Sequence, residues 1–255
     1  MDIFINTFLP LFIAPFIGSF MGVLIARLPE GRPIVWARSI CERCGERLGP
    51  RDLIPLLSYT LTVGRCRHCR TPIGLFPLAV ELAALGVAVW AVLVVSDAEI
   101  WWTCTFGWAL LTLTWIDVRA MILPDVLTLP LALGGLIATA ALEPNALSDH
   151  VMAAVLGYGG LAGFAWIYRQ LRHRDGLGGG DAKLLGAIGA WSGLASLPLT
   201  VFLAACIGLM IAGGTALAGR RMTATTALPF GPCLALAAWL FRLHGATLAE
   251  WVAGL

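Results

Sequence analysis

Three aspartates stand at the ends of strongly apolar stretches of the chain. Asp117 closes one such stretch, Asp125 directly follows Leu123-Pro124, and Asp181 directly follows the glycine run 178–180. Two carboxyl groups held a few Å apart cannot both ionise, so one keeps a proton and acts as an acid while its partner deprotonates a water molecule. Any two of these residues that meet in space would therefore form the acid–base pair of an aspartyl protease.

Helix capping is the simpler explanation for two of the three. Asp181 and Asp125 each precede an apolar stretch, where an aspartate commonly caps the N-terminus of a helix. Asp117 lies at a helix C-terminus, where the helix dipole disfavours an anion, so capping does not explain it. We therefore expect a functional role for Asp117.

The glycines before Asp181 give the backbone freedom close to a membrane. Irregular chain at that depth is tolerated where it lines a cavity or is buried in protein. We expect Gly178, Gly179, Gly180 and Lys183 to form a loop that a substrate strand can approach closely. The segment resembles a phosphate-binding loop only superficially, because it lacks the Gly-Lys-Ser/Thr ending.

Four cysteines form two Cys-x-x-Cys pairs, Cys41 with Cys44 and Cys66 with Cys69, separated by 21 residues. Two such knuckles can direct four thiolates at one tetrahedral zinc ion. Two disulfides are the alternative, but a reducing cytoplasm, in which the charge pattern below places this segment, favours the metal. The remaining cysteines, Cys104, Cys206 and Cys233, lie in apolar stretches, and we assign them no chemistry.

The composition requires a membrane to hold these groups. The chain has 255 residues, of which 59% are hydrophobic and only 13% charged, against about 25% charged in a soluble domain. Its mean hydropathy is +0.85. These values exclude a soluble enzyme and predict an all-α polytopic membrane protein of about eight transmembrane helices. The predicted spans are residues 4–27, 73–95, 99–118, 124–142, 150–170, 183–196, 198–218 and 229–250.

The basic residues predict which ends of the spans face the cytoplasm. With the N-terminus outside, 16 of the 17 Lys and Arg residues lie in or beside inner segments, and Arg242 is the exception. The outer gaps carry acidic residues instead. The inner basic residues are Arg27, Arg32, Arg38, Arg43, Arg47, Arg51, Arg65, Arg67, Arg70, Arg119, Arg169, Arg172, Arg174, Lys183, Arg220 and Arg221; the outer acidic ones are Asp97, Glu99, Glu143 and Asp149.

This topology divides the chain into three parts and places all three aspartates at the inner face. Residues 1–27 form the first transmembrane helix, residues 28–72 a small cytoplasmic zinc-binding domain between helices 1 and 2, and residues 73–255 a seven-helix membrane domain. The basic runs are typical of headgroup contacts in a lipid bilayer, and no basic stripe with interleaved aromatics indicates a nucleic-acid partner.

At this point the sequence resembles the bacterial type IV prepilin peptidases, and the resemblance covers nearly the whole length. Several motifs carry it, in the order expected for the family. They are Gly18–Pro29, the paired knuckles with Ile54–Tyr59 and Pro77–Glu81, Asp117 with Leu123–Pro130, Gly178–Leu185 with Gly189–Gly193, and Pro229–Pro232.

The resemblance implies a membrane aspartyl endopeptidase of the bacterial inner membrane. Such an enzyme removes the leaders of type IV prepilins and type II secretion pseudopilins at the cytoplasmic face. Asp117 and Asp181 match the catalytic aspartates, and Asp125 matches a third, supporting acidic position. Many relatives also methylate the new N-terminus with S-adenosylmethionine. Glu81 could serve that methyl transfer, could support the zinc domain, or could simply reach the membrane interface.

Two other classes compete with a peptidase. A proton-coupled transporter could use the aspartates as a relay, but such proteins carry polar groups near the midplane of several helices, and this chain does not. A non-catalytic membrane scaffold that presents a zinc domain would leave Asp117 unexplained.

Overall fold

The computed structural model describes residues 4–36, 38–96, 98–173, 178–218 and 229–253, and the side chains of this last range up to residue 245. Within them helices are the regular structure, and the cysteine-bearing segment between α1 and α3 is mostly loop with two isolated β-bridges. The all-α prediction is confirmed. Of the charges used to predict the topology, Arg174, Arg220, Arg221 and Asp97 lie outside the described residues.

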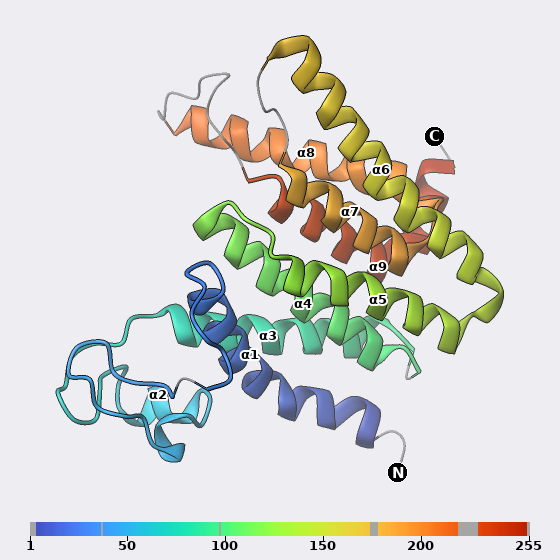
Figure 1. Cartoon of the computed structure of the whole chain (residues 1–255). Coiled ribbons are helices and arrows are strands. Elements are labelled where there is room, and N and C mark those ends of the chain that lie inside the picture. The colour runs from blue at the N-terminus through green and yellow to red at the C-terminus, as the bar shows by residue number, and fades with distance from the viewer. Residues whose placement is uncertain (1–3, 37, 97, 174–177, 219–228, 254–255) are drawn as a thin grey trace. The chain divides into compact units, whose positions relative to one another are not determined.

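Each predicted span corresponds to one long helix (Figure 1). A π-helical turn over Phe4–Phe8 leads into the first, and a five-residue helix, α2 (Leu57–Leu61), lies in the segment that follows. The long helices are α1 (Leu9–Arg27), α3 (Phe76–Val94), α4 (Ile100–Ala120), α5 (Asp125–Leu142), α6 (Leu147–Arg172), α7 (Gly179–Ser192), α8 (Ser196–Leu217) and α9 (Gly231–Ala253).

Five helical segments of the described chain are long and apolar enough to cross a membrane unaided, which makes this a multi-pass membrane protein. They contain α1, α3, α5, α6 and α8. Helix α7 has only 14 residues. At a rise of 1.5 Å per residue it measures about 21 Å, less than the roughly 30 Å thickness of the hydrocarbon core.

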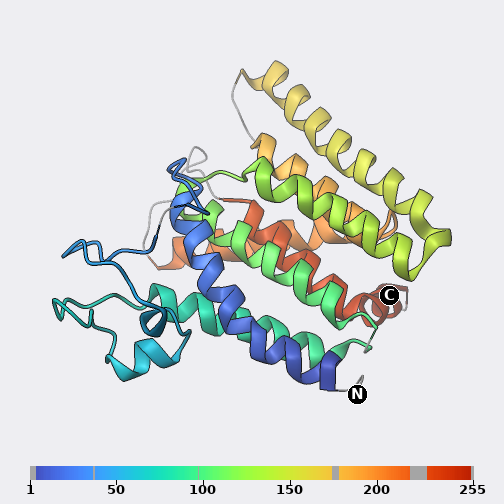
Figure 2. The same ribbon diagram turned by 60° about the horizontal axis from the view of Figure 1, so that its bottom comes forward.

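The chain divides into two compact units, residues 1–112 and residues 113–255. In the first, α1 packs along α3 (Figure 2). The contact is close because α1 presents a glycine: a Cβ added to Gly18 would lie 2.6 Å from the Cα of Glu81. Small residues that bring helix backbones together are the common basis of packing in membranes.

In the second unit, α7 is buried among its neighbours. Every residue from Asp181 to Trp191 except Lys183 is buried. A Cβ at Gly189 would lie 2.6 Å from the carbonyl oxygen of Ala153 in α6, and the indole N–H of Trp191 donates to the carbonyl of Leu131 in α5 at 2.7 Å. The short helix is thus surrounded by protein, which tolerates it at membrane depth.

Candidate carboxylate and cysteine sites

The four predicted metal ligands converge in the first unit. The sulfur atoms of Cys41, Cys44, Cys66 and Cys69 all lie within 4.8 Å of one another, and Cys41 Sγ lies 3.8 Å from Cys69 Sγ. Zinc–sulfur bonds of 2.3 Å in a tetrahedron require sulfur–sulfur distances of about 3.8 Å. All four cysteines are free, so the cluster is not a pair of disulfides, and its donor set fits a zinc ion.

The two knuckles are built alike. The amide of Cys41 donates to the carbonyl of Glu46, and the amide of Cys66 donates to that of Thr71, at 2.8 and 2.9 Å. Each loop then turns at the residue after its second cysteine, through a positive φ of +72° at Gly45 and +58° at Arg70. These local bonds close each turn, so the Cys-x-x-Cys spacing alone fixes most of the geometry.

The surroundings of Cys69 favour a thiolate ligand. The hydroxyl of Thr71 lies 3.4 Å from the Cys69 sulfur. Hydrogen bonding by the Thr71 side chain and backbone lowers the pKa of Cys69 to about 6. A thiol must lose its proton to bind a metal, and Cys69 loses it most readily of the four, whereas desolvation and the neighbouring thiols raise the pKa of Cys44 to about 12.

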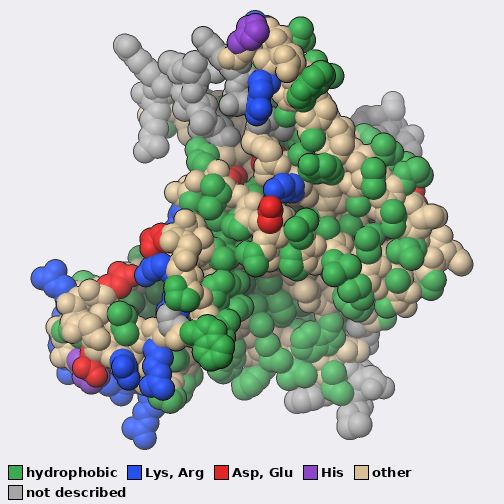
Figure 3. Space-filling model, viewed as in Figure 1, with side chains coloured by type: hydrophobic (Ala, Val, Ile, Leu, Met, Phe, Trp, Pro, Cys, Tyr) green, Lys and Arg blue, Asp and Glu red, His purple; other side chains and the backbone are tan. Residues whose placement is uncertain are grey.

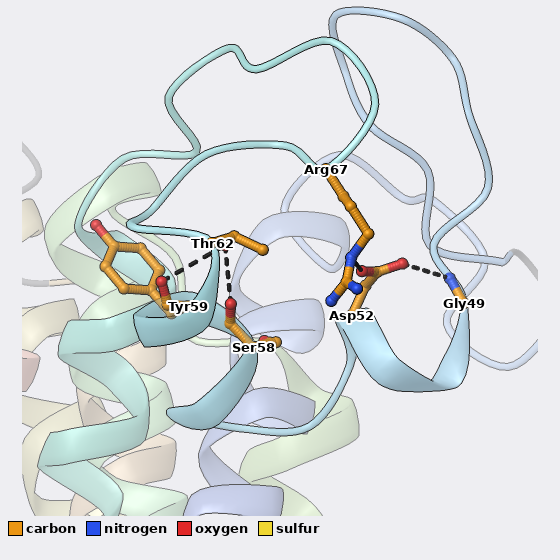
Figure 4. A network of polar contacts seen from close by, with 6 residues as sticks. All are labelled: Gly49, Asp52, Ser58, Tyr59, Thr62 and Arg67. Atoms are coloured by element: carbon orange, nitrogen blue, oxygen red, sulfur yellow. Dashed lines mark hydrogen bonds and ion pairs between the residues drawn. The ribbon is translucent and has the colours of Figure 1, made fainter.

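A polar network holds the loop between the knuckles (Figure 4). The guanidinium Nε of Arg67, in the second knuckle, donates to Oδ1 of Asp52 at 2.9 Å, and the amide of Gly49 donates to Oδ2 of the same carboxylate at 3.1 Å. Asp52 thereby connects the chain that leaves the first knuckle to the second knuckle.

Asp117 lies in the second unit, near the end of α4, and is only 5% exposed. Within the part of the chain that the structure describes, its buried Oδ2 has no hydrogen-bond partner. An unpaired buried carboxylate oxygen is costly, so a polar group of another molecule, such as water or substrate, is the natural partner for it.

Asp181 is the third residue of α7 and is 8% exposed. Gly178, not Asp181, occupies the capping position, and Asp125 likewise follows the capping residue Pro124. The carboxylate of Asp181 folds back over the helix start: a Cβ at Gly178 would lie 3.2 Å from Oδ2. A glycine at this position therefore leaves room for the carboxylate.

The two buried carboxylates share one neighbourhood. They are close enough for a direct electrostatic interaction. The side chain of Leu123 contacts the starts of both α7 and α9, since a Cβ at Gly180 would lie 2.9 Å from it and a Cβ at Gly231 would lie 3.3 Å from it. The fold thus brings together residues 64 positions apart, from the end of α4 and the start of α7.

Asp125 stands apart from this pair. Its side chain is 57% exposed and forms an ion pair with Lys183, with Nζ 2.5 Å from Oδ1. The bond joins the first residue of α5 to the fifth residue of α7. The prediction of a loop here is wrong for three of its four residues: only Gly178 precedes α7, and Gly179, Gly180 and Lys183 lie within the helix. Gly179 opens α7, and a Cβ there would meet nothing within 4 Å.

Sequence reasoning gave no site role to two residues of α9. A Cβ at Gly231 would lie 2.6 Å from Oδ2 of Asp117, and the Gly231 backbone faces that carboxylate. Cys233, which is buried, lies within electrostatic range of both aspartates. The signal for Gly231 was its place between two prolines in Pro229–Pro232; Cys233 gave none beyond its apolar surroundings.

Glu81 occupies a second buried acidic position, in the first unit. It is 6% exposed, and its Oε2 accepts a hydrogen bond from the amide of Leu56 at 2.7 Å. It also interacts with the side chain of Ser19 in α1. The side chain is therefore held by protein groups and is not free to extend into solvent. It joins α1, α3 and the segment that contains α2.

Comparison with known proteins defines the class of this molecule. Residues 104–213 match the type IV leader peptidase family, and residues 12–95 match the bacterial peptidase A24 N-terminal domain. The class is a membrane-embedded peptidase.

Named relatives cover almost the whole chain. A prepilin leader peptidase/N-methyltransferase of Aeromonas hydrophila is 36% identical over 92% of this chain and 89% of its own length. Those of Pseudomonas aeruginosa and Burkholderia pseudomallei are 35% and 38% identical, over 90% and 86% of this chain and 87% and 79% of their own lengths. No solved structure matches the chain. The chain belongs to the type IV leader peptidase family, as its motifs predicted.

Proposed function

We propose that this chain cleaves the leader peptides of type IV prepilins and type II secretion pseudopilins with Asp117 and Asp181. The observation that carries the proposal is that two interacting carboxylates, from α4 and α7, are both buried. One of their oxygens, Oδ2 of Asp117, has no hydrogen-bond partner among the described residues. The relatives' names supply prepilins as the substrate class, and pseudopilins are added from the resemblance of the motifs.

The chemistry follows from sharing one proton between the carboxyl groups. The ionised aspartate takes a proton from water as the water oxygen bonds to the scissile carbonyl carbon, while the protonated aspartate gives its proton to the carbonyl oxygen. The first aspartate then gives its new proton to the leaving amine as the C–N bond breaks, while a hydroxyl of the diol intermediate returns a proton to the second aspartate. The carbonyl of the product acid reforms, and the pair regains its starting protonation state. Asp125 and Lys183 support this step by fixing the start of α7, which carries Asp181.

We place the reaction at the cytoplasmic face of a bacterial inner membrane. The predicted inner segments carry 16 of the 17 basic residues, and Asp117, Asp125 and Asp181 all border such segments. The cysteine cluster would lie on the same side and would hold a structural zinc ion, which supplies folding energy to residues 28–72.

A second activity, methylation of the new N-terminal amine, is suggested by the relatives' names. The methyl donor would be S-adenosylmethionine, to which we assign no residue. Incubation of purified enzyme with prepilin and labelled donor should label the cleaved product; an unlabelled product would limit the enzyme to proteolysis.

Cleavage of a synthetic prepilin by the purified full-length enzyme tests the proteolytic proposal. Asp117→Asn and Asp181→Asn should each abolish cleavage, because the substitutions are nearly isosteric but remove the titrating group. Asp149→Asn is the matched control. Asp149 lies in the first turn of α6, away from the carboxylate pair, and its Oδ2 accepts a hydrogen bond from the Leu194 amide at 2.9 Å. An asparagine oxygen can accept the same bond. Full cleavage by either of the first two variants would refute the assignment.

A further inference from the structure

The cysteine-bearing segment contains a long uncharged stretch. Residues 28–72 carry eight arginines and four acidic residues, but residues 53–64 (LIPLLSYTLTVG) carry none. Arg51 and Arg65 flank this stretch. Figure 3 shows how densely basic side chains gather on the part of the chain around it. A run without charged side chains can leave water at a lower free-energy cost than the charged chain on either side of it.

The apolar side chains of this stretch are not packed into the protein. Leu57 and Leu61, at either end of α2, are 50% and 70% exposed, and Val63 just beyond the helix is 80% exposed. The first and last residues of the helix lie four positions apart and so project from the same face. Together these three side chains form an apolar surface that no described residue of the first unit covers.

The depth of α2 is fixed by Glu81. The amide of Leu56, the residue before α2, donates to Oε2 of Glu81, which is the sixth residue of α3. Five residues of rise correspond to about 7.5 Å along the helix axis. Because α3 is one of the membrane-capable helices, the start of α2 is bound to a residue in the second turn of a candidate membrane span.

The two threonine hydroxyls of the stretch already have partners. Thr60 Oγ1 donates to the carbonyls of Leu56 and Leu57 at 3.0 Å, and Thr62 Oγ1 donates to that of Ser58 at 2.8 Å (Figure 4). Side chains that bond back to the helix in this way can enter an apolar medium without losing hydrogen bonds.

We propose that residues 53–63 lie in the interfacial layer of the lipid bilayer, with Leu57, Leu61 and Val63 among the upper acyl chains. Arg51 and Arg65 then contact anionic headgroups. Short apolar faces bind at this depth when basic residues flank them. Glu81 is the positioning residue, since its carboxylate holds the start of α2 against α3. The cysteine cluster is thereby held beside the membrane surface by lipid as well as by its own chain.

Photocrosslinking in the full-length protein tests the occupant. Leu61 is replaced by p-benzoylphenylalanine, and the enzyme is reconstituted in vesicles of phosphatidylethanolamine and phosphatidylglycerol. Irradiation should give lipid adducts at position 61 and none at the exposed Glu46 of the first knuckle, the matched control. Absence of lipid adducts at position 61, or adducts formed only with an added prepilin, would overturn the proposal.

A second experiment tests the positioning role of Glu81. Glu81→Ala should reduce the yield of lipid adducts at position 61 severalfold and speed amide exchange over residues 56–63. Glu81→Gln keeps an acceptor oxygen for the Leu56 amide and should preserve both. Exchange in the middle of α3 reports general loss of helix packing and should stay unchanged. Wild-type adduct yield and exchange in Glu81→Ala would refute the role, as would a loss of protection throughout α3.

Discussion

The cysteine cluster and the carboxylate pair differ in how much of the chain builds them. The cysteines come from two loops whose turns close through bonds between residues at most five positions apart. Asp117 and Asp181 are 64 positions apart on different helices, and the packing of α7 against its neighbours brings them together. The cysteine cluster therefore tolerates changes elsewhere in the fold, whereas the carboxylate pair depends on close packing of helix backbones.

The largest expected effect concerns the carboxylates as a unit. Asp117→Asn and Asp181→Asn should each lower the rate of prepilin cleavage by about a thousandfold or more, and the double variant should be no slower than either. The reason is that either substitution alone already removes the pair that shares the proton, so the second substitution has nothing further to remove. Zinc content measured on the same samples should equal that of wild type. Additive losses in the double variant would mean that the residues act independently.

Loss of a cysteine should affect the other region. Cys41→Ser or Cys66→Ser should reduce the zinc content from about one ion per chain to near none, because structural zinc requires four ligands. Hydrogen exchange should rise over residues 40–72, where the metal supplies folding energy, and stay unchanged in α7. Faster exchange in α7 would show that the carboxylate region depends on the cysteine cluster for stability, and would contradict the independence of the two regions.

A smaller loss is expected at the start of α9. In Gly231→Ala the new Cβ would lie 2.6 Å from Oδ2 of Asp117, so the carboxylate or the helix must shift. A displacement of this size should cost about 10- to 100-fold in cleavage rate. Gly213→Ala in α8 adds a Cβ to open space and serves as the control. Equal rates for the two variants would remove Gly231 from the site.

The smallest effect is expected at the exposed ion pair. Asp125→Asn should slow cleavage by no more than about fivefold, because exposed pairs contribute roughly 0.2–1 kcal/mol. The difference in rate between wild type and Asp125→Asn should shrink as ionic strength rises, since salt screens the exposed ion pair of the wild type. A loss comparable to that of Asp181→Asn would place Asp125 in the chemistry itself.

The sequence predicted the bounds of the helices to within a few residues. Apolar length sets the spans, so the predicted stretch 124–142 became α5 (Asp125–Leu142), and predicted 73–95 became α3 (Phe76–Val94). The short sixth span shifted toward its N-terminus, from 183–196 to Gly179–Ser192, because Gly178 provides the helix start and Gly193, with φ of +75°, ends it. Helix ends depend on such local backbone geometry more than on hydropathy.

The sequence by itself determined the spans, the clustering of basic charge and the four-cysteine cluster, since each depends on residue type and spacing within short stretches. Only the tertiary structure decided that Asp125 pairs with Lys183 in the open while Asp181 is buried near Asp117, and that Glu81 holds α2 against α3. The physical reason is that burial and electrostatic contact depend on which helix faces meet. That depends on where glycine allows two backbones to touch, which no single stretch of sequence records.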